Sequence, residues 1–294
     1  MSPALQSSAA PAKINLYLHV CARRDDGYHL LDSLVAFADV HDTITVSPSD
    51  DLSLAIGGDF AQDLTGDDDN LVIRAARALA TAAGIEARAA ITLTKQLPVA
   101  SGIGGGSADA AATLRALSGL WNLDLDDAVM AALALALGAD VPVCLGGRTA
   151  FMSGIGETIA PAPALPAAWL VLVNPGVAVS TPAVFKMLDG NFTTANGHFD
   201  HAPADARELA SILSERNNDL EAPARQMGPV IGDVLGALTA TENVLLARMS
   251  GSGATCFGLY GNPGDADRAA QSIAQDRPDW WIKTASLQTD ATGA

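Results

Sequence analysis

The stretch PVASGIGGGSADAAA, at residues 98–112, decides how the rest of this 294-residue chain is interpreted. It contains four glycines within five positions: Gly102, Gly104, Gly105 and Gly106. Glycine allows positive φ and lets another group approach the backbone closely. Before the glycines, Ile91 and Leu93 alternate with threonines, which predicts a strand, and after them apolar residues recur at helical spacing as far as Trp121. The sequence therefore predicts a strand, a glycine loop and a helix, in that order.

The junction between this loop and its helix is a candidate anion site. Ser107 is placed to cap the predicted helix. A helix start offers unpaired N–H groups and a partial positive charge, and phosphate is a frequent occupant of such a site. Neither standard phosphate motif fits, because the stretch lacks the Gly-Lys-Ser/Thr ending of a P-loop and Ser107 replaces the last glycine of G-x-G-x-x-G. A simple turn before a helix remains the alternative at this point.

The composition excludes several classes of protein. Hydrophobic residues make up 49% of the chain, which is typical of a globular protein. The 33 acidic residues outnumber 17 lysines and arginines and give a net charge of −16, which argues against a nucleic-acid partner. Cys21, Cys144 and Cys256 lie too far apart for a disulfide framework or a metal motif, which favours a reducing compartment. Without a secretory signal or a bilayer-length apolar run, we expect a cytoplasmic protein with no membrane partner.

The segment APAKINLYLHVCARRDDGYHLLDSLV, at residues 10–35, carries polar residues on a predicted strand and after a turn. Apolar residues alternate with polar ones along the strand, which places Lys13 and Asn15 on one face. An Asp-Gly turn follows and leads into Tyr28 and His29. A tyrosine ring can stack on a nucleobase and a histidine can hydrogen-bond to the edge of the base. A solvated lysine, a tyrosine packed beside the turn and a half-exposed histidine are the structural alternatives.

The remaining sequence predicts a mixture of helices and strands. Asp140 opens an Asp-Val-Pro segment after an apolar helix, where it can simply shape a turn. A Pro/Ala-rich segment at residues 161–166 indicates a domain boundary. Beyond it, the order strand, helix, strand, strand, helix, strand is that of a ferredoxin-like split βαβ unit. We expect a surface loop at residues 189–203, one helix at 224–241, and a small-residue loop at 250–254 that could approach the glycine loop or a phosphate.

Four motifs resemble, in the right order, those of the GHMP kinases, the family that contains galacto-, homoserine, mevalonate and phosphomevalonate kinases. They lie at residues 10–34, 98–112, 138–142 (GADVP) and 250–255. The resemblance implies an α+β, two-domain GHMP kinase fold. Its N-terminal domain, at residues 1–160, would be ribosomal-protein-S5-like, and its C-terminal domain, at residues 161–294, would be ferredoxin-like.

The resemblance also implies an ATP-dependent kinase that phosphorylates a small-molecule alcohol. Asp140 would accept the proton of the acceptor hydroxyl, and Lys13 would hold Asp140 ionised and stabilise charge at the reaction centre. Mg²⁺ would bridge the phosphates, with the Ser107 hydroxyl as a candidate metal ligand. The expected ATP-binding residues are Pro98, Val99, Ala100, Ser101, Gly102, Ile103, Gly104, Gly105, Gly106, Ser107 and Ala108.

The triplet Gly-Tyr-His at residues 27–29 is similar to that of GHMP kinases whose substrate is a cytidyl diphosphate sugar-alcohol. In such an enzyme Tyr28 and His29 would hold the cytosine, Asn15 would orient the substrate, and Phe185, on the far domain, would cover the other face of the ring. A homoserine or mevalonate kinase would keep the glycine loop but not the triplet. A non-catalytic ligand sensor would have lost Lys13 or Asp140. We expect small-molecule partners only, and a monomer or weak homodimer.

Overall fold

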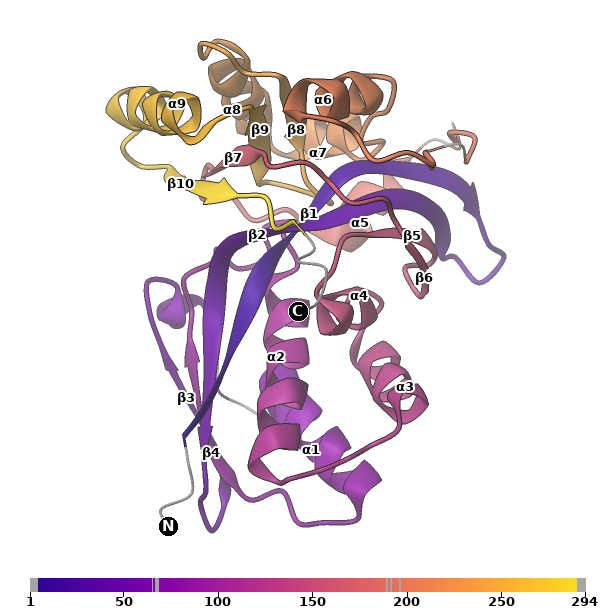
Figure 1. Cartoon of the computed structure of the whole chain (residues 1–294), viewed down its shortest axis with the longest axis vertical. Helices are drawn as coiled ribbons and strands as arrows, with labels where there is room; N and C mark the ends of the chain where they lie inside the picture. The colour runs from indigo at the N-terminus through magenta and orange to yellow at the C-terminus, as the bar shows by residue number, and fades with distance from the viewer. Residues whose placement is uncertain are drawn as a thin grey trace. The chain divides into compact units, whose positions relative to one another are not determined.

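The computed structural model describes residues 5–64, 66, 69–188, 190, 192–195 and 197–289 (Figure 1). Contacts divide the chain into two compact units. The first unit is Met1–Ala12, Val40–Val99 and Gly104–Gly147, and the second is Lys13–Asp39, Ala100–Ile103 and Arg148–Ala294. Two long strands, β1 (Gln6–Arg23) and β2 (His29–Ser47), therefore contribute residues to both units. The division of the sequence into domains at residue 160 stays a prediction.

The first unit packs helices against β3 (Leu52–Gly57), β4 (Ala89–Thr94) and parts of β1 and β2, and β1 pairs with β2. The C-terminal part of β2 pairs antiparallel with β4, and β4 pairs parallel with β3. A 3-10 turn, η1 (Ala61–Asp63), follows β3. The helices are α1 (Leu71–Ala83), α2 (Gly105–Leu120), α3 (Asp127–Leu137) and α4 (Val141–Gly146). Because α1 and α2 lie on one side of β3 and β4, the apolar side chains of β4 are buried beneath them (Figure 1).

The ends of the first unit's helices follow sequence signals with one exception. Asn70 caps α1 by accepting a hydrogen bond from Val72 N at 3.0 Å, and Gly84 ends this helix with φ 67°. Ser107 lies inside the first turn of α2, so the prediction that it caps this helix is wrong. Gly104 is the N-cap residue, with φ 66°. Its left-handed conformation lets the chain enter the helix three residues earlier than the capping rule predicts.

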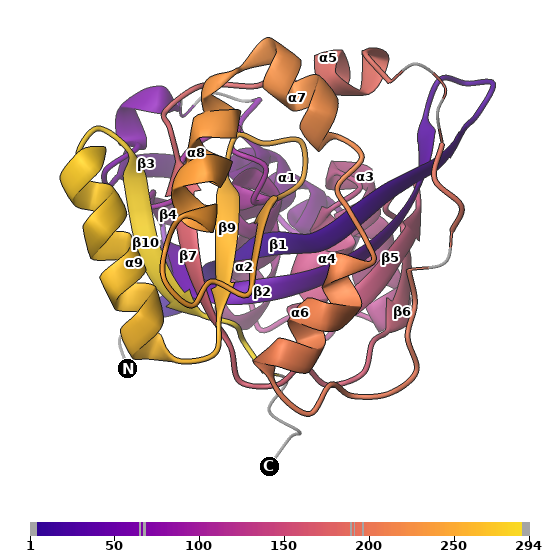
Figure 2. The same cartoon turned by 90° about the horizontal axis from the view of Figure 1, so that it is seen from above.

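The second unit contains the predicted ferredoxin-like arrangement. Its strands are β7 (Trp169–Asn174), β8 (Leu246–Met249), β9 (Cys256–Tyr260) and β10 (Trp281–Ser286). They form an antiparallel sheet in the order β10-β7-β9-β8. Helices α8 (Val230–Thr239) and α9 (Pro263–Asp276) pack against this sheet (Figure 2). The N-terminal part of β2 also pairs with β5 (Ala150–Gly154), which forms a hairpin with β6 (Thr158–Pro161).

Three further helices complete this unit: α5 (Thr181–Lys186), α6 (Ala206–Ser214) and α7 (Glu221–Met227). The prediction of one helix at residues 224–241 is wrong, because α7 ends at Gly228 and Pro229 is the N-cap residue of α8. A proline cannot continue the hydrogen-bond ladder of a preceding helix, so the chain starts a new one. Residues 6–9, which precede the segment whose alternation predicts a strand, extend β1 toward the N-terminus. Residues 1–4 lie outside the described part of the chain.

The core of the second unit lies between its four-stranded sheet and neighbouring helices. Val171 and Val173 of β7, Ile231 and Leu238 of α8, and Ile273 of α9 are all buried there. Full burial of one such side chain contributes roughly 1.5–3 kcal/mol to stability. Throughout the described residues, no helix has the combination of length and apolar character needed to cross a membrane.

Candidate active site

The part of the glycine loop that belongs to the second unit packs against the small-residue loop between β8 and β9. Gly102 has φ 79°, and a Cβ built on it would lie 2.4 Å from Ser250 O and 2.8 Å from Gly253 N. From the opposite side, a Cβ on Gly251 would lie 2.6 Å from Gly102 O. Ser250 Oγ also donates a hydrogen bond to Gly102 O at 3.0 Å. The predicted approach of the second loop to the first is confirmed, and it requires glycine at these positions.

We expect Gly102→Ala to destabilise the protein and to raise KM for ATP. Positive φ alone costs a residue with a Cβ about 1–2 kcal/mol. At Gly102 the new Cβ would also meet backbone atoms of a neighbouring loop, which cannot move aside as a flexible side chain can. The measurements are urea-induced unfolding and steady-state kinetics with ATP varied.

Gly84→Ala is the matched control for that variant. Gly84 also has positive φ, 67°, but a Cβ built on it has no described atom within 4 Å. This variant should lose only the conformational energy and keep the wild-type KM for ATP. Equal losses of stability in the two variants, with KM unchanged in both, would show that close packing at Gly102 is unimportant.

The remaining part of the loop begins α2 in the first unit. The first hydrogen bond of the helix runs from Ala108 N to Gly104 O, at 2.8 Å. The amides of Gly105, Gly106 and Ser107 lie before this bond in the chain. Gly106 is exposed, while Gly105 and Ser107 are half-buried. Amides at a helix start can hold an anion, and the positive end of the helix macrodipole favours one. The geometry therefore supports the phosphate interpretation, although Ser107 enters it as a first-turn residue and not as a cap.

Lys13 and Asn15 lie together on β1, as their spacing predicts. Lys13 is buried, and its Nζ donates to Asn15 Oδ1 at 3.1 Å. Asn15 Nδ2 donates in turn to Ser33 Oγ at 2.8 Å, and Asn15 N donates to Ser250 Oγ at 3.1 Å. The backbone of Lys13 is tied to the glycine loop, because Lys13 N donates to Ile103 O at 2.9 Å. Hydrogen bonds thus hold both candidate side chains in one orientation.

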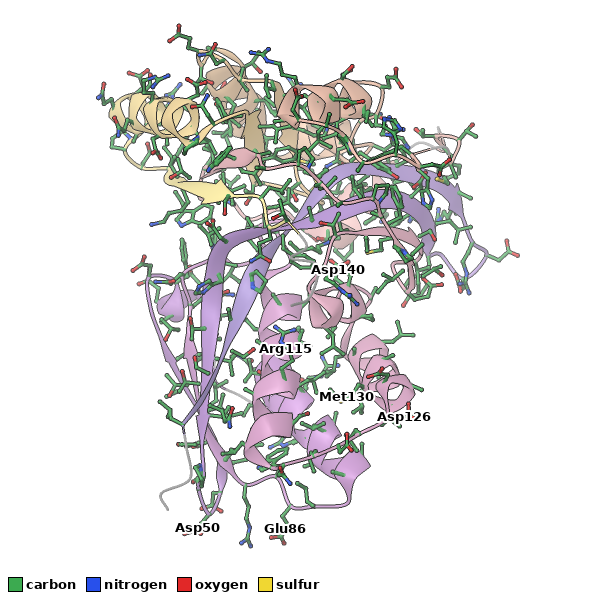
Figure 3. All side chains as sticks on the ribbon, in the orientation of Figure 1. Asp50, Glu86, Arg115, Asp126, Met130 and Asp140 are labelled. Carbon is green, nitrogen blue, oxygen red and sulfur yellow. The ribbon has the colours of Figure 1, made fainter. Side chains whose placement is uncertain are left out.

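Asp140 lies in the first unit, between α3 and α4 (Figure 3). It is the N-cap residue of α4, yet within the described structure its side chain makes no capping hydrogen bond. Pro142 follows at the start of this helix, where a missing N–H costs nothing. Arg115 of α2 donates to Cys144 O at 3.0 Å and to Leu145 O at 3.3 Å, which holds the other end of α4. The helix that carries Asp140 is therefore fixed without using its carboxylate as a cap.

Aromatic side chains form a third group, around His29. The His29 and Phe185 rings stack with centroids 5.0 Å apart, and Phe192 meets His29 edge-on at 6.3 Å. Tyr28 is 59% exposed. Burial, assisted by the nearby charge of Arg23, lowers the pKa of His29. The ring of His29 is therefore mostly neutral at pH 7, with one nitrogen that donates and one that accepts.

One member of this aromatic group was expected from the sequence and another was not. Phe185 was expected near the substrate, and it lies in the same compact unit as Tyr28 and His29. Phe192 was missed, because it lies within residues 189–203, which carry turn and polar residues and predict a surface loop. Two phenylalanines in such a stretch were the available signal.

The described residues of the segment 189–203 form no helix or strand and most of them are exposed, as expected for a surface loop. Two buried residues anchor it, since Phe199 is 9% exposed and Gly197 N donates to Asp32 Oδ2 at 2.9 Å. Tyr17 OH donates to Asp32 Oδ1 at 2.8 Å, so one buried carboxylate joins the segment to β1 and β2. Burial and the bonded Asp32 raise the pKa of Tyr17, which keeps its hydroxyl protonated as the donor. Residues 189, 191 and 196 lie outside the described part.

Comparisons with known proteins agree with this geometry. Residues 70–148 match the family described as GHMP kinases N terminal domain, and residues 201–278 match GHMP kinases C terminal. The chain is 54% identical to the 4-diphosphocytidyl-2-C-methyl-D-erythritol kinase of Rhodospirillum rubrum, over 96% of this chain and 92% of the relative. It is 56% identical to the enzyme of that name from Ruegeria pomeroyi, over 92% and 95% of the two chains.

Solved structures extend the likeness to the fold. A crystal structure of 4-(cytidine 5'-diphospho)-2C-methyl-D-erythritol kinase matches with a TM-score of 0.75 and 35% identity, over 96% of this chain and 98% of the other. A homoserine kinase from Cytophaga hutchinsonii has the same TM-score at 18% identity, over 97% and 95% of the two chains, and shows the shared fold alone. The chain is a small-molecule kinase with the α+β, two-domain GHMP kinase fold, and it belongs to the GHMP kinases and, within them, to the 4-diphosphocytidyl-2-C-methyl-D-erythritol kinase family.

Proposed function

We propose that this kinase transfers the γ-phosphoryl group of ATP to the 2-hydroxyl group of 4-diphosphocytidyl-2-C-methyl-D-erythritol, a step in making isoprenoid precursors by the non-mevalonate pathway. The observation that carries the proposal is identity above 50% to relatives of that name along nearly the whole chain. This chain is 18% identical to a homoserine kinase and 15% identical to a mevalonate kinase of similar structure. Such low identities support a shared fold but not a shared substrate.

Phosphoryl transfer depends more on positioning and charge neutralisation than on covalent chemistry. Asp140 would accept the proton of the acceptor hydroxyl as the hydroxyl oxygen attacks the γ-phosphorus, while the bond from that phosphorus to the β,γ-bridging oxygen breaks and ADP leaves. Lys13 would stabilise the negative charge that develops on the transferring group. The amides of the glycine loop at residues 98–108 would hold the phosphates of ATP, and Asn15 would orient the acceptor.

Mg²⁺ fits this arrangement as a companion of ATP. No group of three or more His, Cys, Asp or Glu side chains in the described structure could hold a metal by itself. Mg²⁺ usually keeps several waters and binds through substrate phosphates with few protein ligands. When bound it would neutralise phosphate charge, and the hydroxyl of Ser107, on the first turn of α2, is the candidate protein ligand.

The aromatic group would form the site for the cytosine ring. A neutral His29 offers one donor and one acceptor, which complement the ring nitrogen and the amino group of a cytosine. Because His29 already stacks on Phe185, these two rings would present a combined aromatic surface. Tyr28 is exposed enough to stack on a base from outside this surface.

We expect Tyr28→Ala or Phe185→Ala to raise KM for the cytidyl substrate by roughly ten- to a hundredfold. Loss of one stacking face costs about 1–3 kcal/mol, and about 1.4 kcal/mol corresponds to a factor of ten in affinity. KM for ATP should change little, because the glycine loop is a separate set of residues. Steady-state kinetics with each substrate varied in turn would measure both constants.

Tyr28→Phe is the control for the stacking argument. It keeps the ring and removes only the hydroxyl, so KM for the cytidyl substrate should stay near the wild-type value. A rise in KM for ATP without a rise for the cytidyl substrate would assign these aromatic residues to the ATP site and contradict the proposal.

The function itself is tested by ATP consumption with three acceptors: 4-diphosphocytidyl-2-C-methyl-D-erythritol, homoserine and mevalonate. Turnover with the first alone is the expected result. Turnover with another acceptor would overturn the substrate assignment, and no turnover with any acceptor would favour a ligand sensor.

All three cysteines are free thiols, which supports a location in the reducing cytoplasm. The monomer or weak homodimer stays a prediction.

A further inference from the structure

A buried group of charges lies inside the first unit, apart from the candidate catalytic residues. Lys95 follows the last residue of β4 and is 2% exposed. Its Nζ donates to Asp42 Oδ2 at 2.5 Å and to Asp109 Oδ2 at 2.8 Å. Asp42 and Asp109 are buried as well, at 0% and 3% exposed. We call Asp42, Lys95 and Asp109 the buried triad.

One end of the buried triad fixes the chain that enters the glycine loop. Asp42 Oδ1 accepts hydrogen bonds from Gln96 N at 2.6 Å and from Leu97 N at 2.8 Å. Lys95 N donates to Gly57 O at 2.7 Å, which ties its backbone to the end of β3. The residues directly before Pro98 are therefore held by a carboxylate that is itself bonded to Lys95.

The other end of the buried triad fixes the helix that leaves the loop. Asp109 lies in the second turn of α2 and bonds Lys95 from there. A Cβ built on Gly105, the first residue of α2, would lie 3.0 Å from Lys95 Nζ. The start of the helix thus rests directly on the ammonium group, and glycine at residue 105 leaves the space that this group occupies.

A contribution to stability does not by itself explain three buried charged side chains at this place. Buried ion pairs can often be replaced by apolar residues without loss of stability, because desolvation cancels the attraction. Here one ammonium faces two carboxylates, and in the described structure Asp109 Oδ1 has no hydrogen-bond partner. Burial outweighs the attraction of Lys95 and raises the pKa of Asp109 to about 7. An arrangement with this desolvation cost points to a positional role.

We propose that Lys95 is a positioning residue for ATP, which acts through Asp42 and Asp109 to hold residues 96–99 and 104–108, the first unit's part of the glycine loop, in the conformation that binds the phosphates. Lys95 itself is too buried to touch the nucleotide. It joins the entry and the exit of the loop through side chains 67 residues apart in the sequence, from Asp42 to Asp109. This inference rests on the proposed ATP site in the glycine loop.

Lys95→Met tests the inference through binding of a non-hydrolysable ATP analogue, measured by calorimetry without any acceptor. Loss of the bonds that hold the loop on both sides should weaken phosphate binding, so we expect affinity to fall by about tenfold or more, which corresponds to about 1.4 kcal/mol. In steady-state kinetics KM for ATP should rise in parallel, while KM for the cytidyl substrate should stay within about twofold. Unchanged affinity for the analogue in folded Lys95→Met would overturn the inference.

Asp109→Ala serves if Lys95→Met does not fold. It leaves one cation with one anion, and alanine is a good helix former, so this variant should keep the fold. It removes the bond to α2, so affinity for the analogue should fall in the same direction. Wild-type affinity in this variant would also overturn the inference.

Two controls separate positioning from general loosening of the fold. Lys283→Met makes the same change at an exposed site on β10 and should leave affinity unaltered. Leu79→Ala removes a fully buried side chain from α1 and should lower Tm without weakening binding of the analogue. A loss of affinity in Leu79→Ala equal to that in Lys95→Met would overturn the inference. If the wild-type protein bound the analogue but did not turn over the cytidyl substrate, the proposed function would be contradicted. The positioning role of Lys95 would not be.

Discussion

Asp140→Asn is expected to lower kcat by about 10²–10⁴-fold, the range in which a general base contributes. The amide has nearly the shape of the carboxylate but cannot take the proton of the acceptor hydroxyl. KM for ATP should stay close to the wild-type value, because the glycine loop is left intact. Because asparagine has nearly the size and shape of aspartate, this variant should remain folded. Steady-state kinetics and thermal unfolding measure these quantities together.

Asp126→Asn is the matched control, at the other end of α3 (Figure 3). Asp126 Oδ1 accepts a hydrogen bond from Ala128 N at 3.0 Å, so this aspartate serves as a helix cap. Asparagine caps helices about as well as aspartate, so kcat and stability should both remain near wild type. Turnover of Asp140→Asn at a rate close to that of Asp126→Asn would remove Asp140 from the role of base.

Much of the fold follows from local patterns in the sequence. The alternation around Lys13 predicts the central part of β1, and Asn70 and Gly84 mark the two ends of α1. The order of elements after residue 166 predicts the ferredoxin-like sheet, which has the expected strand order. These features depend on residues that are close in the chain, where periodicity and caps carry the information.

The errors come from places where a local rule has a competitor. A serine near the start of a helix predicts a cap at Ser107, but the left-handed Gly104 starts α2 first. Continuous apolar periodicity predicts one helix at residues 224–241, but Gly228 and Pro229 divide it.

The buried triad could not have been predicted, because its members are distant in the sequence and each is ordinary by itself. A lysine after a strand is usually solvated, and Lys95 is instead enclosed by Asp42 and Asp109. Only the folded chain brings the end of β4, the middle of β2 and the second turn of α2 together. The candidate catalytic residues can be recognised from the sequence, since Lys13 and Asp140 each lie in a short recognisable motif.

Lys13 owes its orientation to a series of hydrogen bonds on β1 and β2. Its Nζ donates to Asn15 Oδ1, Asn15 Nδ2 donates to Ser33 Oγ, and Ser33 Oγ donates to Tyr17 O at 2.6 Å. A buried ammonium held in this way is already placed before substrate arrives, so little reorganisation is needed when charge develops. Pre-organised positive charge of this kind stabilises the transition state more than the ground state.

Lys13→Met is therefore expected to lower kcat by about 10²–10³-fold, the cost of losing one pre-organised group that stabilises developing charge. Methionine fills a similar volume without a charge. Removal of Lys13 also leaves the buried Asn15 Oδ1 without its donor, so a fall in Tm is expected beside the loss of rate. Kinetics at saturating substrates, paired with thermal unfolding of the same samples, would separate the loss of rate from the loss of stability.

Lys13→Arg distinguishes a requirement for a compact ammonium from a requirement for positive charge alone. The guanidinium is a planar fork, and its geometry differs from the single Nζ that meets Asn15 Oδ1 at 3.1 Å. We therefore expect Lys13→Arg to restore little of the rate, although it restores the charge. The exposed variant Lys283→Met controls for removal of one positive charge from a chain with a net charge of −16. If Lys13→Met kept the rate of that surface variant, developing charge at the reaction centre would have to be stabilised by other groups, and Lys13 would be a structural residue of β1.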